Sequence, residues 1–141
     1  MTYLLDTNVL SELRKLGDGK ADPGVVAWVA EHGRVRFSIS VISVLELERG
    51  ILGVERRDAA QGARLRTWLE SNVLPTFEGY ILPVDAAVAR CCAALHVPDR
   101  RPEADALIAA TALVNGLSVV TRNVRDFDGT GVSVIDPWRR T

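Results

Sequence analysis

Asp6 is the first residue whose type and position could serve chemistry. It directly follows the apolar run over residues 3–5, where a carboxylate buried without a partner would be costly. A structural alternative is that Asp6 caps the next helix, which would stabilise that helix by about 1 kcal/mol. Because Thr7 and Asn8 could cap it equally well, Asp6 is also a candidate metal ligand.

Asp105 is a second candidate, in the first turn of a helix predicted over residues 102–115. An acid there complements the helix dipole by about 0.3–1 kcal/mol, but Glu103 in the same turn can do the same. Helical spacing places Asp105 on one face with Ile108 and Ala112. A carboxylate on such an inward-looking face needs a partner, and a metal ion is a suitable one.

Glu46 and Glu48 compete for a third position on the helix predicted to begin at Ser40 or Ser43. Glu46 lies on the same helical face as small residues such as Gly50, which leave room for a ligand to approach. Glu48 lies beside apolar residues of the same helix. Periodicity does not separate the two, and a solvated charged face explains either one.

Asp126 and Asn123 follow the strand predicted over residues 117–120. Asp126 is a further candidate acid, and its structural alternative is a loop aspartate paired with Arg122 or Arg125. Asn123 has a similar alternative as a turn residue.

The elements that must position these side chains are short apolar strands that alternate with amphipathic helices. This pattern predicts βαβ units and an α/β fold, a three-layer α/β/α sandwich with a mainly parallel central sheet. Ligands bind beyond the carboxyl ends of such strands, where Asp6 and residues 121–123 both lie. We expect one domain over residues 1–141. Strands are expected at residues 3–5, 35–39, 80–82, 117–120 and 132–135. The first helix should begin at about residue 9, and the others should span residues 23–33, 40–53, 57–73, 85–96 and 102–115.

Composition is that of an ordinary globular protein, with 141 residues, 48% hydrophobic and 25% charged. No apolar run approaches the ~20 residues of a membrane span, and a carboxylate at Asp6 comes too early for a secretory segment. We therefore expect a cytoplasmic protein without a membrane partner.

The cysteines, Cys91 and Cys92, are adjacent, and neighbouring cysteines rarely reach the geometry of an unstrained disulfide. With His32 and His96 as the only histidines, no Cys/His cluster has zinc-ligand spacing. We therefore expect any metal site to consist of oxygen ligands.

The formal net charge of −1 argues weakly against a nucleic-acid-binding protein, since such domains are usually basic. The arginines are unevenly spread, however, so a basic rim could surround an acidic centre. Candidate phosphate contacts are Arg14, Lys15, Arg49 and Arg122, and a solvated face is at least as good an explanation for each.

Four segments, taken in order, resemble the PIN-domain family: residues 4–11, 46–50, 104–112 and 121–127. The closer resemblance is to the VapC and FitB-like toxins of bacterial toxin–antitoxin pairs, and it extends to the tail at residues 134–138. One such motif would be weak, but four in order and over nearly the whole chain are specific.

The resemblance implies a Mg²⁺-dependent endoribonuclease, with Mn²⁺ as the alternative ion. It implies Asp6, Glu46 and Asp105 as the first three acids and so favours Glu46 over Glu48. Several relatives carry an acid at the position of Asn123, so Asp126 is the candidate for the fourth charge. It also implies a pocket-lining hydroxyl at Thr121, an RNA substrate, a homodimer and a cognate VapB-like antitoxin protein.

The chemistry suits these residue types, because converging carboxylates repel one another unless a cation neutralises them. Mg²⁺ prefers oxygen ligands, and metal ions activate water and neutralise charge on a phosphodiester, whether one ion is bound or two. Asp6 and Asp105 are the expected principal ligands, with Glu46 binding through water or accepting a proton.

Two other functions remain open at this point. A PIN fold could serve as an interaction module that binds RNA or a partner protein without catalysis. A phosphatase or phospho-receiver also places an aspartate at a strand end, but a phosphatase would require an acid where Asn8 stands, and a receiver a lysine where Arg122 stands.

Overall fold

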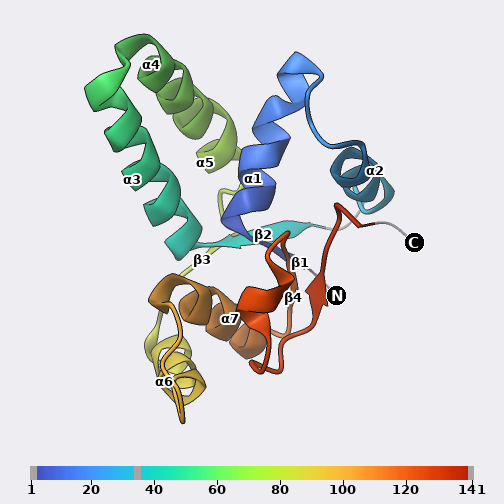
Figure 1. The fold of residues 1–141 in the computed structure, drawn as a ribbon, viewed down its shortest axis with the longest axis vertical. Helices are drawn as coiled ribbons and strands as arrows, with labels where there is room; N and C mark the ends of the chain where they lie inside the picture. Colours follow the sequence, from blue (N-terminus) through green and yellow to red (C-terminus); the bar gives the residue numbers. More distant parts are fainter. Residues whose placement is uncertain (1–2, 34–35, 140–141) are drawn as a thin grey trace.

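The central sheet has five strands, all parallel, in the order β3-β2-β1-β4-β5. The computed structural model describes residues 3–33 and 36–139 (Figure 1). β1 lies in the middle of the sheet, between β2 and β4, so the residues that follow these three strands meet at one edge. The strands are β1 (Tyr3–Leu5), β2 (Phe37–Ser40), β3 (Ile81–Leu82), β4 (Ser118–Val120) and β5 (Val134–Ile135).

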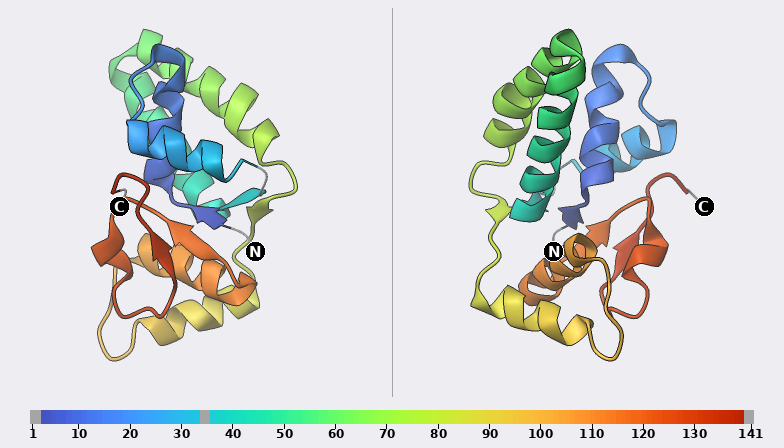
Figure 2. Two further views of the ribbon diagram at one scale, coloured as in Figure 1. Left: turned by 90° about the vertical axis from the view of Figure 1, so that its right-hand side faces the viewer. Right: turned by 60° about the vertical axis from the view of Figure 1, so that its left-hand side comes forward.

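Helices cover both faces of the sheet, which confirms the predicted three-layer α/β/α sandwich. α1 to α5 lie over one face, and α6 and α7 over the other (Figures 1 and 2). In the described part of the chain, no helix combines the length and apolar character needed to cross a membrane. The helices are α1 (Thr7–Arg14), η1 (Lys15–Asp18), α2 (Pro23–Glu31), α3 (Val41–Arg57), α4 (Ala59–Trp68), η2 (Leu69–Val73), α5 (Leu74–Thr76), α6 (Ala86–Leu95), α7 (Glu103–Asn115) and η3 (Val124–Phe127).

Side chains of each central strand divide between the two helical layers, because successive residues of a strand point to opposite faces. Leu5 and Val120 pack into the core beneath α1 to α5, whereas Leu4 and Val119 pack against α7. All four are at most 1% exposed. Burial on both faces explains why the strands appear in the sequence as uninterrupted apolar runs.

Helix starts agree closely with the sequence predictions. The Ser40 hydroxyl accepts the Ile42 N–H at 3.0 Å and caps α3, and Asp85 caps α6 through the Val88 N–H at 2.9 Å. α7 ends at Gly116, whose φ of +67° is the left-handed conformation that favours glycine.

Several boundaries differ from the predictions by one or more residues, for example β5, which begins at Val134 rather than at residue 132. β2 begins at Phe37 rather than at residue 35, which lies outside the described residues. α3 continues through Gly53 to Arg57, because packing against α4 supports its last turns. The two helices approach so closely at Gly62 that a Cβ there would lie 2.6 Å from the Glu55 side chain.

The charged stretch predicted over residues 57–73 is helical, but it is divided into α4 and the π-helical turn η2. Leu69 is 1% exposed, and Leu65 and Trp68 pack against the same core cluster. Leu69 thus belongs to the core, whereas the half-buried Leu65 and Trp68 pack on the core and also line a groove beside α3.

Candidate active site

Three of the four predicted acids line one pocket of about 400 Å³ at the carboxyl edge of the sheet. Asp6 follows β1, Glu46 lies in α3, and Asp105 lies in the first turn of α7. These residues are distant in sequence, and parallel strand order brings their elements together. The pocket is lined by Asp6, Thr7, Asn8, Ser11, Glu12, Glu46, Asp105, Arg122, Asn123 and Trp138.

Asp6 both caps a helix and lines the pocket, so the two interpretations of this residue are compatible. Its Oδ1 accepts the Thr7 N–H at 2.8 Å at the start of α1. Its Oδ2 accepts the Thr121 hydroxyl at 2.8 Å. Only 6% of Asp6 is exposed, and these hydrogen bonds fix the orientation of its carboxylate.

Thr121 holds the ends of β1 and β4 together. Its hydroxyl is fully buried, donates to Asp6, and accepts from Asn8 Nδ2 at 3.1 Å and from the Asn123 N–H at 3.0 Å. One donated and two accepted bonds use the full capacity of a hydroxyl. The Thr121 hydroxyl, which we expected to line the pocket, thus lies behind the residues that line it and orients Asp6.

Glu46 is tied to the same region through Thr7. The Thr7 hydroxyl donates to Glu46 Oε1 at 2.7 Å and lies 2.9 Å from the Ser43 hydroxyl. Thr7 therefore contacts Asp6 with its backbone N–H and Glu46 with its side chain, which fixes the two acids relative to one another.

Glu48 points toward α4 and does not line the pocket. Its carboxylate pairs with Arg66, with Oε1 2.8 Å from Nη1, and this hydrogen bond lowers the pKa of Glu48. Arg66 also bonds Glu55 at 3.1 Å. Of the two glutamates that periodicity left open, Glu46 lines the pocket and Glu48 does not, and the role of Glu46 as a site residue stays a prediction.

The carboxylates lie close enough to influence one another's ionisation. Burial first, and then the charges of Asp126, Asp6 and Glu46, raise the pKa of Asp105 to about 6. Burial also raises the pKa of Asp6, despite opposing hydrogen bonds from Thr121 and Thr7. A pocket of mutually repelling oxygen ligands is the donor set that suits a hard divalent cation.

Asp126 lies at the rim and not in the pocket wall. It is exposed in η3 and faces a neighbouring hollow of about 830 Å³. Its charge nevertheless raises the pKa of both Asp6 and Asp105, whereas Asn123 lines the pocket itself. A direct role for Asp126 as metal ligand stays a prediction.

Comparisons with known proteins bear on this arrangement. The family model described as PIN domain matches residues 3–132. The chain belongs to the PIN-domain family. It is 35% identical to the VapC ribonuclease Y4jK of Sinorhizobium fredii, over 96% of each chain, and 35% identical to Toxin FitB of Neisseria gonorrhoeae, over 96% of this chain and 97% of that one.

Solved structures agree with this assignment of the PIN fold. The crystal structure of FitAcB from Neisseria gonorrhoeae matches with a TM-score of 0.85 and 33% identity, over 98% of this chain and 99% of that chain. The resemblance to VapC and FitB-like toxins that the sequence motifs indicated is thereby confirmed.

Five residues of this PIN-domain pocket were not predicted as site residues from the sequence: Thr7, Asn8, Ser11, Glu12 and Trp138. Ser11 and Glu12 stand three and four residues after Asn8, so helical spacing from the strand end could have identified them. Glu12 is held by structural bonds, since it accepts the Asp22 N–H at 2.8 Å and pairs with Lys15. Trp138 enters from the tail, and no local pattern indicated this.

The four candidate phosphate contacts differ in position. Arg122 lines the PIN-domain pocket, with its guanidinium carbon 5.4 Å from the centre of the Trp138 ring. Arg14 lines an adjoining groove, Lys15 pairs with Glu12 at 3.2 Å, and Arg49 is exposed on α3. Arg122 is therefore the best placed to contact a phosphate at the acids.

The sequence favoured oxygen ligands for any metal site, and the structure adds a mixed group of side chains that this expectation did not consider. Cys92, His96 and Glu103 bring three ligand atoms within 4.8 Å of one another. The spacing rule considered only cysteines and histidines, whereas the packing of α6 against α7 supplies a glutamate. Both cysteines are free thiols, as expected.

Proposed function

We propose that this protein is a metal-dependent endoribonuclease, that residues 1–141 form one PIN domain, and that it acts as the toxin of a toxin–antitoxin pair. The convergence of Asp6, Glu46 and Asp105 on one pocket is the observation that carries the proposal. The VapC ribonuclease and FitB toxin among its relatives support the same function.

The residues present fit a divalent cation. Asp6 and Asp105 would be the principal ligands of Mg²⁺, or of Mn²⁺, with Glu46 beside them and Asp126 adding charge from the rim. A bound cation would supply an activated water and neutralise charge on the phosphodiester.

Residues of the chain itself would orient the acids, position the attacking water and bind the substrate phosphate. Thr121 and the Thr7 N–H each bond one oxygen of Asp6 and so keep its carboxylate in one orientation. Thr7 holds one oxygen of Glu46, and the other oxygen can orient the attacking water and accept its proton. Arg122 at the rim would bind a phosphate of the substrate and offset the repulsion between RNA and the acids.

A cognate partner would occupy the groove that adjoins the pocket. This groove, of about 390 Å³, runs between α1, α3 and α4 and shares Thr7, Ser11 and Glu46 with the pocket. One similar structure, 28% identical with a TM-score of 0.65, is a toxin–antitoxin complex from Klebsiella pneumoniae. We propose a VapB-like antitoxin protein as the partner, a homodimer of the toxin, and a cytoplasmic location.

Glu46→Gln should reduce RNA cleavage at least about 10-fold, because the amide cannot accept a proton from water. Glu48→Gln is the matched control, two residues away on the same helix and paired with Arg66, and it should cleave at the wild-type rate. The measurement is the initial rate on a structured RNA with Mg²⁺, with and without EDTA. Equal cleavage rates for Glu46→Gln and wild type would contradict the proposal.

The same assay, run in parallel on a phosphomonoester, separates the alternative functions. An interaction module would bind RNA but show no cleavage that EDTA abolishes, and a phosphatase would hydrolyse a phosphomonoester instead. We expect EDTA-sensitive cleavage of RNA and no release of phosphate from the monoester.

Binding of RNA should weaken steeply as salt rises, because phosphate contacts release counterions. Arg122→Gln should reduce the slope of log K against log salt by about 1. Arg90→Gln, an exposed arginine on α6, should leave the slope unchanged. Fluorescence anisotropy in EDTA measures this without cleavage, and equal slopes for Arg122→Gln and wild type would remove Arg122 from the RNA contacts.

A further inference from the structure

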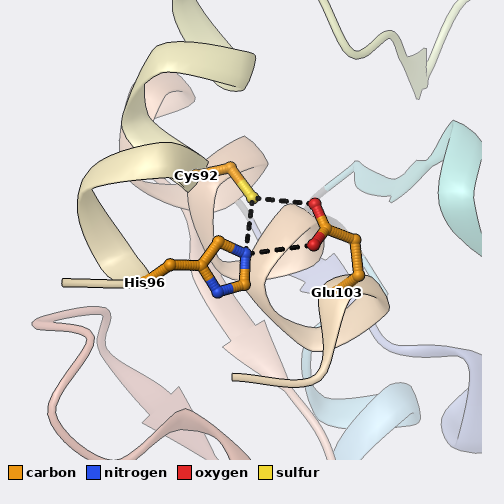
Figure 3. A group of neighbouring side chains, drawn as sticks. All are labelled: Cys92, His96 and Glu103. Atoms are coloured by element: carbon orange, nitrogen blue, oxygen red, sulfur yellow. Dashed lines mark hydrogen bonds and ion pairs between the residues drawn. The ribbon is translucent and has the colours of Figure 1, made fainter. Parts of the chain in front are cut away.

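Cys92, His96 and Glu103 form a compact cluster on the far side of the sheet from α3 (Figures 1 and 3). Cys92 and His96 lie one turn apart at the end of α6, and Glu103 is the first residue of α7. Their side chains point toward one another from the two helices (Figure 3). We propose that this cluster is a second cation site, which takes a thiophilic divalent ion such as Zn²⁺.

The three side chains lie near the separations that a small tetrahedral ion requires. Zn²⁺ binds sulfur at about 2.3 Å and nitrogen or oxygen at about 2.0–2.1 Å, which places tetrahedral ligand atoms roughly 3.3–3.6 Å apart. Cys92 Sγ lies 3.7 Å from His96 Nε2 and 3.8 Å from Glu103 Oε1. His96 Nε2 lies 3.2 Å from Oε2, the other oxygen of the same carboxylate. With one oxygen taken from Glu103, the three ligand atoms lie within 4.8 Å of one another. A rotation of the Glu103 side chain, which is 58% exposed, would close the site around an ion.

Exposure within the cluster is graded, which leaves a route for the ion. Cys92 is 3% exposed, the His96 side chain 15% and the Glu103 side chain 58%. An ion can therefore enter from the Glu103 side and keep a water as its fourth ligand. A thiolate and an imidazole select Zn²⁺ over Mg²⁺, so this site and the carboxylate pocket would take different ions.

Proton positions change when the ion binds. Without it, His96 Nδ1 accepts the Arg101 N–H at 3.0 Å, so Nε2 carries the ring proton and donates to Glu103. Zn²⁺ binding releases the Cys92 thiol proton to solvent, and the ring proton moves from Nε2 to Nδ1. One proton is released per ion, and the partly buried Arg101 N–H loses its acceptor, a cost that the three metal–ligand bonds must exceed.

Co²⁺ is the probe for this site, because a thiolate ligand gives a near-ultraviolet charge-transfer band that oxygen ligands alone cannot give. The full chain is titrated with excess Mg²⁺ present to occupy the carboxylate pocket. We expect one Co²⁺ per chain with this band and the intense visible absorption of a tetrahedral ion. Co²⁺ binding should release one proton per ion in unbuffered solution, and Zn²⁺ should then displace Co²⁺ without further proton release.

Cys92→Ser should abolish the charge-transfer band, and His96→Gln should weaken Zn²⁺ binding at least 10-fold. Cys91→Ser is the matched control, since it removes the adjacent thiol and should leave both measurements unchanged. If Cys92→Ser unfolds by circular dichroism, His96→Gln decides, because it leaves the buried thiol in place. Zn²⁺ affinity equal to wild type in His96→Gln, or loss of the band in Cys91→Ser, would overturn the assigned ligands.

Discussion

Asp105→Asn should abolish metal-dependent RNA cleavage and, in the same protein, raise the melting temperature of the metal-free state. Activity should fall at least about 100-fold, because the amide supplies neither the charge nor the second oxygen of a principal metal ligand. Stability should rise because the half-buried carboxylate is repelled by the charges of Asp126, Asp6 and Glu46. A substitution that lowers activity and raises stability marks a functional carboxylate, whereas loss of a structural carboxylate would lower stability.

The gain in stability depends on pH in a defined direction. The pKa of Asp105 is raised to about 6 in the folded protein and lies near 3.9 in an unfolded chain. Between these values the folded state binds more protons, so the free energy of unfolding falls as pH rises through this window. The gain in the free energy of unfolding that Asp105→Asn brings should therefore be absent below about pH 4 and complete above about pH 6.

Thermal unfolding in EDTA at pH 4 and pH 7.5 measures this effect. We expect Asp105→Asn to melt roughly 2–4 °C above wild type at pH 7.5 and to match it at pH 4. Asp18→Asn, an exposed aspartate in η1, should change neither the melting temperature nor the cleavage rate. A lower melting temperature for Asp105→Asn at pH 7.5 would mean that its carboxylate stabilises the fold.

Thr121→Val should damage stability and activity together. Valine has nearly the shape of threonine, but it leaves Asp6 Oδ2, Asn8 Nδ2 and the Asn123 N–H without their shared partner. Loss of such a buried bonding group costs about 1–3 kcal/mol. A misoriented Asp6 should reduce cleavage about 10–100-fold, as replacements of residues that orient metal ligands do.

Two variants isolate the hydroxyl of Thr121. Thr121→Ser keeps it and should retain most activity. Thr111→Val removes another fully buried hydroxyl, which bonds the Leu107 carbonyl within α7, and should leave the cleavage rate unchanged. Urea unfolding and initial rates on RNA give both quantities, and full activity of Thr121→Val would show that Asp6 does not need this bond.

Local patterns predicted much of the fold and two of the acids. Residues 3–5 are apolar because β1 is buried on both faces, and Ser40 and Asp85 cap helices because their side-chain oxygens accept free backbone N–H groups. Asp6 and Asp105 could be identified because each stands where its local surroundings are apolar and a carboxylate needs a partner.

The rest depends on contacts between distant residues. Glu46 and Glu48 differ because Arg66, on another helix, binds Glu48, and neither residue's own helix contains that information. Trp138 reaches the pocket from the end of the chain. Glu103 joins Cys92 and His96 only through the packing of α6 against α7, and no spacing rule within one helix predicts such a meeting.

The hydrogen bond between Thr121 and Asp6 spans 115 residues, and this has a consequence for synthesis of the protein. The ribosome makes Asp6 well before its partner, which is added about 6–23 s later at typical elongation rates. A nascent or truncated chain that ends before Asp105 and Thr121 lacks part of the carboxylate pocket. The proposed nuclease site can therefore form only after residues 105 and 121 have both been made, and this delay would give a co-expressed antitoxin time to accumulate.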